Sequence, residues 1–413
     1  MTDLRNYAIV TAAYWGFTLT DGALRMLVLL HFHGLGFTPL DLAILFLLYE
    51  AMGILTNLLG GWLGAKFGLR LTLIAGLSLQ IVALFTMSAV QPDWLLSMSL
   101  IYVMAAQALS GIAKDLTKMS SKSAVKLVID DQVQGQLFRW VALLTGSKNA
   151  LKGIGFLLGG VMLGHLGFQG SMWLMASALA SVLILFSISF RGTLGKAKAL
   201  RRRDLFAKQR EINLLSAARL FLFAARDVWF VVGVPIFLYS ELGWSFTEVG
   251  GFLAIWVIGY GAVQACTPAL LRKANSVQAA ARSATIWGTL LISIPVIMAF
   301  LLQNPGATPL TAGQIVIVGI YLFGAVFALN SSIHSYLIVA FADRNQVSMD
   351  VGFYYMANAA GRFMGTFLSG LVFQLFGLSA CLWVSAALIS LAVLFAIPLR
   401  SISMSSPNAL DKE

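Results

Sequence analysis

The sequence predicts an all-α membrane protein with twelve transmembrane helices in two six-helix bundles, and three observations lead to this fold class. Of the 413 residues, 59% are hydrophobic and only 11% are charged, which leaves too little polar surface to cover a soluble globule of this size. Apolar stretches of roughly 20 residues recur along the whole chain, and each can cross a hydrocarbon core of ~30 Å. The two halves of the chain also share a pattern of residues.

The expected helices of the first half cover residues 7–31, 40–64, 70–90, 94–117, 138–163 and 168–190. Those of the second half cover 212–239, 247–271, 279–302, 313–341, 349–374 and 378–399. Gly, Pro and Asn mark several of the turns between them. The first apolar run has no small-residue cleavage site, so we expect it to remain as a full span. The predicted units are an N-terminal bundle at 1–190, a basic linker at 191–211, a C-terminal bundle at 212–400 and a tail at 401–413.

The loops alternate in charge. Every second loop contains neither Lys nor Arg, namely 31–41, 91–94, 164–171, 241–248, 302–313 and 376–381. The opposite loops hold Lys66, Arg70, Lys122, Lys126, Arg272, Lys273 and Arg344, together with the linker, which has eight basic and two acidic residues. The positive-inside rule therefore predicts that both termini and the linker are cytoplasmic. Binding of anionic lipid or a regulator is the alternative role of the linker.

An internal repeat relates the two halves. A shift of 210 positions places Lys152, Gly160 and Gly167 over Arg362, Gly370 and Gly377. A shift of 207 places 35–38 (LGFT) over 242–245 (LGWS) and Asp41 over Glu248, and Asp21 and Asp227 fall within one residue of each other. Six spans plus six, with the halves in the same orientation, are typical of two-bundle secondary transporters. We therefore expect the substrate site between the halves.

Basic residues lie deep inside the expected spans, at Arg25, Lys148, Lys152, Arg226 and Arg362. Ionisable residues at membrane depth are costly and are usually functional. Because fewer acids lie at this depth, a cavity lined by these residues has a positive surplus and favours an anionic substrate. Guanidinium groups bind oxyanions bidentately and ammonium groups act as point charges. Asn149, Asn358 and His334 are expected to bind the substrate as well, His334 as polar cavity wall and the two asparagines through contacts with substrate hydroxyl groups. The alternative is that these cations pair with neighbouring acids, as Asp21 and Arg25 would at i and i+4.

Three acids accompany the cations, namely Asp21, Glu50 and Asp227. Glu50 is the first candidate for proton coupling because burial raises the pKa of a carboxyl group, and Asp21 is the second. For each acid the alternative is a permanently ionised partner of a nearby cation. Lys114 and Lys118 lie toward the inner end of the fourth span, where they form either an electrostatic funnel at the inner mouth or a plain surface face.

Other classes of function are disfavoured by the sequence. Cys266 and Cys381 are the only cysteines, which excludes a disulfide framework or a multi-thiolate metal site by number. No nucleotide-binding glycine loop and no cluster of metal ligands is visible, so we expect neither an enzyme nor a cofactor. We attribute the net charge of +11 to the basic cytoplasmic loops that set the membrane topology rather than to binding of nucleic acid.

The segment at 61–70 (GWLGAKFGLR) resembles the loop signature of the major facilitator superfamily, although Ala65 and Leu69 replace an acid and a base of that signature. A closer resemblance, to the ArsJ-type organoarsenical efflux permeases of this superfamily, is carried by 11–15 (TAAYW), 18–26 (TLTDGALRM), 110–123 (SGIAKDLTKMSSKS), 145–153 (TGSKNALKG) and 224–229 (AARDVW). Arg25 and Arg226, in the first and seventh spans, are also similar to the arginine pair of the organophosphate:phosphate antiporters.

The closer resemblance implies export of 1-arseno-3-phosphoglycerate, an arsenate ester made when a glyceraldehyde-3-phosphate dehydrogenase uses arsenate in place of phosphate. It further implies arsenate resistance, functional coupling to that dehydrogenase, and a location in the bacterial inner membrane. We expect a monomer in the lipid bilayer. The alternative is an antiporter of organophosphates or other organic anions without a role in arsenic metabolism.

Overall fold

The computed structural model describes residues 2–67, 69–125, 134–190, 209–270, 277–342 and 347–401, and these residues form helices and turns without a strand. Within this part of the chain, nine helices are long and apolar enough to cross a membrane by length and composition. Two of these nine, of 43 and 52 residues, are each bent at a glycine and so contain two spans. The nine helices therefore provide eleven spans, and α1 (Thr2–Gly34) provides the twelfth. The predicted fold class, an all-α membrane protein of twelve spans, is therefore confirmed.

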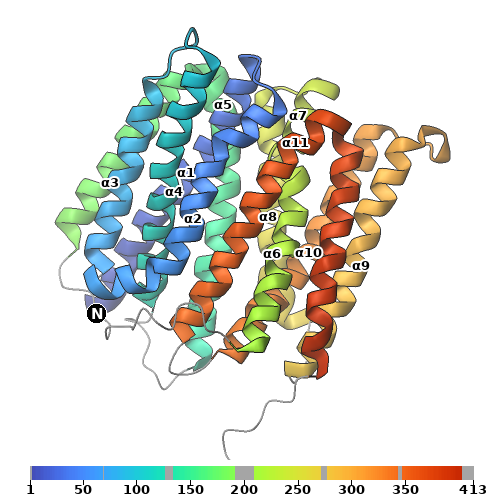
Figure 1. Ribbon diagram of the computed structural model, residues 1–413. Helices are drawn as coiled ribbons and strands as arrows, with labels where there is room; N and C mark the ends of the chain where they lie inside the picture. Colours follow the sequence, from blue (N-terminus) through green and yellow to red (C-terminus); the bar gives the residue numbers. More distant parts are fainter. Residues whose placement is uncertain are drawn as a thin grey trace, which may run out of the picture.

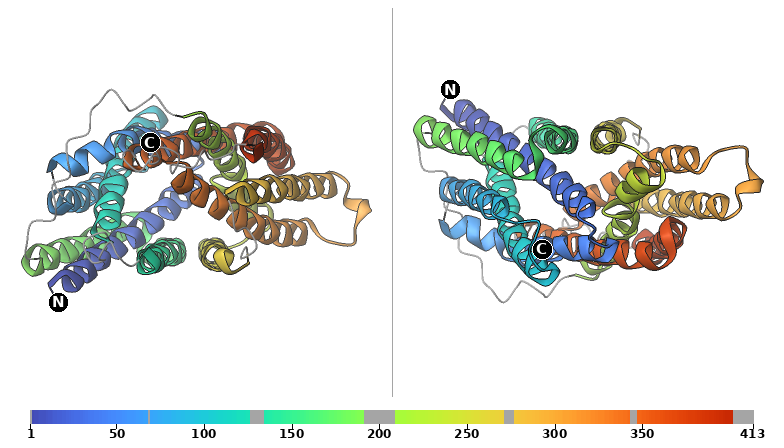
Figure 2. Two further views of the ribbon diagram at one scale, coloured as in Figure 1. Left: turned by 90° about the horizontal axis from the view of Figure 1, so that it is seen from below. Right: turned by 90° about the horizontal axis from the view of Figure 1, so that it is seen from above.

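The first half of the chain folds into α1, α2 (Pro39–Phe67), α3 (Leu69–Ser88), α4 (Leu96–Val125) and α5 (Gln134–Ser189). The second half contains α6 (Arg210–Phe230), α7 (Gly233–Ile236), η2 (Phe237–Glu241), α8 (Phe246–Leu270), α9 (Val277–Gln303), η3 (Pro305–Ala307), α10 (Ala312–Phe341), α11 (Val347–Ala396) and η4 (Ile397–Ser401). Figure 1 shows α1–α5 on one side of the molecule and α6–α11 on the other. Along the boundary α2 packs on α11 and α5 packs on α8 (Figure 2).

The internal repeat is present in the backbone. Gly167 (φ 66°) bends α5 into two spans and Gly377 (φ 76°) bends α11 in the same way. Gly36 (φ 88°) and Gly243 (φ 71°) open the turns before α2 and α8, and these four are the only described residues with positive φ. Glycine adopts this conformation without the penalty that a Cβ brings. The two pairs are 210 and 207 residues apart, which are the two shifts of the sequence repeat.

The seventh span is not the continuous helix predicted at 212–239. The α-helix ends at Phe230 and is followed by the single turn α7 and the π-helical segment η2. Pro235 explains the break, because proline has no N–H for the helical bond to the residue four before it and its ring crowds that carbonyl. The N–H groups of Val232 and Gly233 instead donate to Ser369 Oγ on α11, at 3.2 and 3.3 Å. The break is thus held by the neighbouring helix.

The two halves are joined at the end of the molecule opposite the start of α1 (Figure 1). The N–H of Leu40 donates to Gln374 Oε1 at 2.9 Å, and His33 Nε2 lies 2.9 Å from Ser240 Oγ. Gly370 packs directly on the start of α2, where a Cβ would collide with the Pro39 carbonyl and with Ala43. At this end α2 is therefore in direct contact with α11, and α1 with η2.

Several sequence predictions lie outside the described part of the chain. These are the predictions for the linker from 191 to 208 and for the tail from 402 to 413. The same holds for the side chains of the loop signature from 61 to 69 and for five basic loop residues, namely Lys122, Lys126, Arg272, Lys273 and Arg344.

Close packing of α1 on α5 gives a first testable prediction. A Cβ built on Gly155 would lie 2.6 Å from the Leu19 carbonyl oxygen and 3.1 Å from Gly22 Cα. Gly155→Leu should therefore destabilise the protein by roughly 1–3 kcal/mol through overpacking. The thermal unfolding midpoint in detergent measures this effect. Gly164→Leu is the matched control, since no heavy atom lies within 4 Å of its Cβ position. Equal midpoints for the two variants would contradict the prediction.

Candidate functional site

A cavity of about 230 Å³ lies between the halves, lined by α1, α2, α4 and α5 from the first and by α6, α8, α10 and α11 from the second. Eight of its described lining residues are basic: Arg25, Lys114, Lys118, Lys148, Lys152, Arg219, Arg226 and Arg362. Four are acidic: Asp21, Glu50, Asp115 and Asp227. The wall therefore carries a net of four positive charges when all these groups are ionised. All five deep cations singled out in the sequence line this one cavity.

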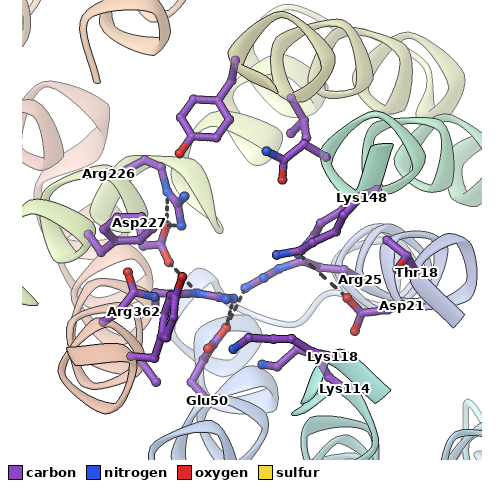
Figure 3. Close-up of a pocket in the computed structure, with 18 of the residues that line it drawn as sticks. Thr18, Asp21, Arg25, Glu50, Lys114, Lys118, Lys148, Arg226, Asp227 and Arg362 are labelled. Carbon is purple, nitrogen blue, oxygen red and sulfur yellow. Dashed lines mark hydrogen bonds and ion pairs between the residues drawn. The ribbon is translucent and has the colours of Figure 1, made fainter. Parts of the chain in front are cut away.

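Five of these side chains form a charge ladder, with Arg25, Glu50, Arg362, Asp227 and Arg226 in alternating order (Figure 3). Glu50, which is fully buried, pairs with Arg25 Nη2 at 3.4 Å and with Arg362. Asp227 accepts a hydrogen bond from Arg226 Nε at 2.6 Å and lies 3.4 Å from Arg362 Nε. The ladder crosses from the first half to the second between α2 and α11.

Asp21 and Arg25 do not form the i, i+4 pair that the sequence allowed. Arg25 reaches α2, where it shares the buried Glu50 carboxylate with Arg362. Asp21 accepts a hydrogen bond from the Tyr49 hydroxyl at 2.5 Å and lies 3.9 Å from Lys152 Nζ. The geometry around Glu50 is that of an ion pair shared by two guanidinium groups.

Lys114 and Lys118 line the same cavity as the deep cations. Figure 3 shows both side chains pointing into the same space as Arg25. Lys118 Nζ donates to Asn57 Oδ1 at 2.8 Å and to Asp115 Oδ1 at 3.2 Å. Lys114 Nζ lies 3.9 Å from the centroid of the Tyr49 ring. Asp115 was missed in the sequence although it stands directly between these lysines.

Arg219 was also missed, and it is the most unusual cation in the cavity. Its guanidinium donates to Asn358 Oδ1 at 2.9 Å and to Ser331 Oγ at 2.9 Å, and it lies 4.0 Å from the Phe223 ring centroid. The residue is only 5% exposed, yet no carboxylate of the described residues lies within ion-pair distance of it. Arg219 precedes Arg226 by two helical turns, so the spacing alone places both on one face of α6.

Uncharged lining residues of the cavity are connected by a chain of hydrogen bonds. Asn149 Nδ2 donates to Gln264 Oε1 at 3.0 Å, and Gln264 Nε2 donates to the Tyr260 hydroxyl at 2.7 Å. The Tyr260 hydroxyl lies 3.4 Å from Ser331 Oγ, which also accepts from Arg219. The chain therefore links α5 of the first half to the arginine of the second. Asn149 and Asn358, both expected to contact the substrate, line the cavity.

His334 does not line the cavity, contrary to expectation. It is buried in α10, with 2% of its surface exposed, whereas Ser335 is the residue of this helix on the cavity wall. Successive residues point about 100° apart around a helix, which turns His334 away from the cavity when Ser335 faces it. No group of three or more metal-ligating side chains suited to a metal ion occurs among the described residues.

Comparisons with known proteins agree on a fold. A family model described as Major Facilitator Superfamily matches residues 8–338. The structure is similar to that of a bacterial homologue of the iron transporter ferroportin in an inward-facing state, with a TM-score of 0.68, 15% identity, and coverage of 97% of this chain and 99% of that one. A search of curated protein sequences gives no significant match.

Two further solved structures are similar over nearly the whole chain. The nucleoside transporter NupG has a TM-score of 0.68 and 15% identity, with 97% of this chain and 99% of that chain covered. The human organic anion transporter MFSD10 (TETRAN) has a TM-score of 0.66 and 14% identity, with 96% and 100% covered. At these identities the likeness shows the fold alone.

Proposed function

The chain belongs to the major facilitator superfamily of transporters, and we propose that it is a secondary exporter of a small organic anion with several negative charges. The proposal depends on one observation, the buried Arg219 guanidinium that faces the cavity with uncharged partners only. A buried charge without a counter-ion is costly. An anionic substrate would supply the missing partner and would find a surplus of positive charge around it.

The dimensions of the cavity favour a small metabolite. Small-molecule sites usually measure about 300–1,000 Å³, and this cavity of about 230 Å³ lies below that range. Its arginines and lysines suit phosphate, arsenate and carboxylate groups. Together with the resemblance to the ArsJ-type permeases, these features support 1-arseno-3-phosphoglycerate as the substrate. A glyceraldehyde-3-phosphate dehydrogenase would supply it, and a monomeric exporter in a bacterial inner membrane, with cytoplasmic termini, would remove it.

The second candidate is an antiporter of organophosphates or other organic anions. The cavity favours it as well, because arginines of both halves, Arg25 and Arg226, line it as a phosphate clamp would require. Competition experiments separate the two candidates. Sugar phosphates and inorganic phosphate should compete strongly for an organophosphate antiporter and weakly for an exporter of the arsenate ester.

Uptake into everted membrane vesicles tests the proposed function. The ester is generated outside the vesicles from glyceraldehyde 3-phosphate, arsenate, NAD and the dehydrogenase, and trapped arsenic is measured over time. We expect uptake that responds to a pH gradient or to a counter-anion, and none in vesicles that lack the protein. Uptake no greater than in those control vesicles would overturn the proposal. Unchanged uptake by Arg226→Ala would remove that residue from the substrate site.

A further inference from the structure

The ion pairs of the two halves follow the same repeat as the backbone. Lys152 on α5 lies 3.9 Å from Asp21 on α1, and Arg362 on α11 lies 3.4 Å from Asp227 on α6. Lys152 and Arg362 are equivalent at the shift of 210, and the two aspartates are equivalent within one residue of the shift of 207. Each half thus brings one cation and one aspartate to the cavity in corresponding places.

The repeat is broken at Glu50. The shift of 207 that aligns the starts of α2 and α8 also aligns Tyr49 with Trp256 and Asn57 with Gln264, so that like side chains correspond. The same shift places Glu50 over Val257, and both residues line the cavity. Where α2 presents a carboxylate to Arg362, α8 presents an apolar side chain at the corresponding place.

The helices that carry Val257 and Lys152 are in direct contact. A Cβ on Gly153 of α5 would lie 2.7 Å from the Ala254 carbonyl oxygen of α8, and one on Gly261 of α8 would lie 3.0 Å from Asn149 Cβ. The interface of α5 with α8 therefore corresponds to the interface of α11 with α2. Their charges differ, since Arg362 has two carboxylate partners and Lys152 has Asp21 alone among the described residues.

A second lysine increases this difference. Lys148 lies one helical turn before Lys152 and points into the cavity (Figure 3), whereas the shift of 210 places Asn358 at its counterpart in α11. The α5–α8 side therefore carries two cations and one acid, and the α2–α11 side carries one cation and two acids at the corresponding positions. At these corresponding positions the α5–α8 side therefore has a net of one positive charge, whereas the α2–α11 side has a net of one negative charge.

We propose that an oxyanion of the substrate binds between Lys152 and Val257, at the place that corresponds to the Glu50 carboxylate in the other half. A phosphate, arsenate or carboxylate group there completes the second ion pair that the repeat leaves open. Lys148 and the Tyr260 hydroxyl, one turn after Val257, border this oxyanion seat. The inference depends on the proposed function, because it assigns one end of that same anionic substrate to a place in the cavity.

Supplying the missing carboxylate from the protein tests this seat. Purified full-length protein in detergent is titrated with 3-phosphoglycerate, a stable anion of the proposed class, by calorimetry. Val257→Glu should bind it at least about tenfold more weakly than Val257→Gln, which has nearly the same volume and no charge. Equal affinities of the two variants, or native affinity of Val257→Glu, would overturn the seat. Melting curves establish that both variants are folded.

A second variant in the same binding experiment moves the carboxylate from one half of the protein to the other. In the double variant Glu50→Val, Val257→Glu, the open ion pair moves to Arg362, so binding should recover by about tenfold over Val257→Glu alone. No recovery would contradict the equivalence of the two places. A native protein that binds no phosphoglycerate-class anion would refute the proposed function and the seat with it. If the native protein binds 3-phosphoglycerate and Val257→Glu binds it with the same affinity, the seat alone is refuted.

Discussion

Replacing Arg219 with glutamine is expected to lower anion uptake by about 100-fold. Removing one partner of a buried, hydrogen-bonded charge interaction costs roughly 2–5 kcal/mol, and each 1.4 kcal/mol is about tenfold in affinity. Glutamine keeps an amide donor for Asn358 or Ser331, which now accept from the guanidinium at 2.9 Å each. The substitution therefore removes the charge while it preserves part of the local hydrogen bonding. Initial uptake rates in everted vesicles measure the effect.

Two further variants separate charge from geometry. Arg219→Lys keeps the charge but loses the planar fork, so we expect a smaller loss of about tenfold. Arg282→Gln removes an exposed arginine of α9 that is not among the described lining residues, and it should transport at the native rate. Native uptake by Arg219→Gln, with the protein present in the membrane at native level, would contradict the role of Arg219 in binding.

Most of the fold follows from properties that the sequence displays directly. Span length, loop charge and the repeat are local or periodic signals, and the four left-handed glycines fall at the spacings that the repeat predicts. The exception is the seventh span, where the apolar composition continues through Pro235 and predicts one continuous helix. Whether a proline bends or interrupts a membrane helix depends on a neighbour that can accept the released N–H groups, and here that neighbour is Ser369, 134 residues further along the chain.

The site was harder to predict, because pairing depends on which helices meet. The presence of deep cations is visible in the sequence, but their partners are not. Asp21 is the acid nearest to Arg25 in the sequence, yet Arg25 pairs with Glu50 on another helix. Arg219 lies only seven residues after the predicted start of its span, a position where long basic side chains usually extend toward water. The structure shows it buried instead, because Asn358 and Ser331 from α11 and α10 surround its guanidinium.

Replacing Glu50 with glutamine should destabilise the empty protein and make its stability depend on added anions. Glu50 is fully buried and is the shared partner of Arg25 and Arg362. Removing one partner from a buried ion pair costs about 3–5 kcal/mol, because the charge left behind stays away from water. A bound anion replaces part of the lost partner, and a ligand that binds only the folded state raises its stability by mass action.

The measurement is the melting temperature in detergent at increasing concentrations of inorganic phosphate. Glu50→Gln should melt well below the native protein without phosphate and should gain more from phosphate than the native protein does. Glu241→Gln is the control, since this exposed acid at the end of η2 is not among the described lining residues, and its melting curve should follow the native one at every concentration. A Glu50→Gln variant that melts like the native protein and shows no added response to phosphate would mean that the two guanidinium groups do not depend on this carboxylate. The charge ladder would then be a consequence of packing rather than an anion-binding element of the cavity.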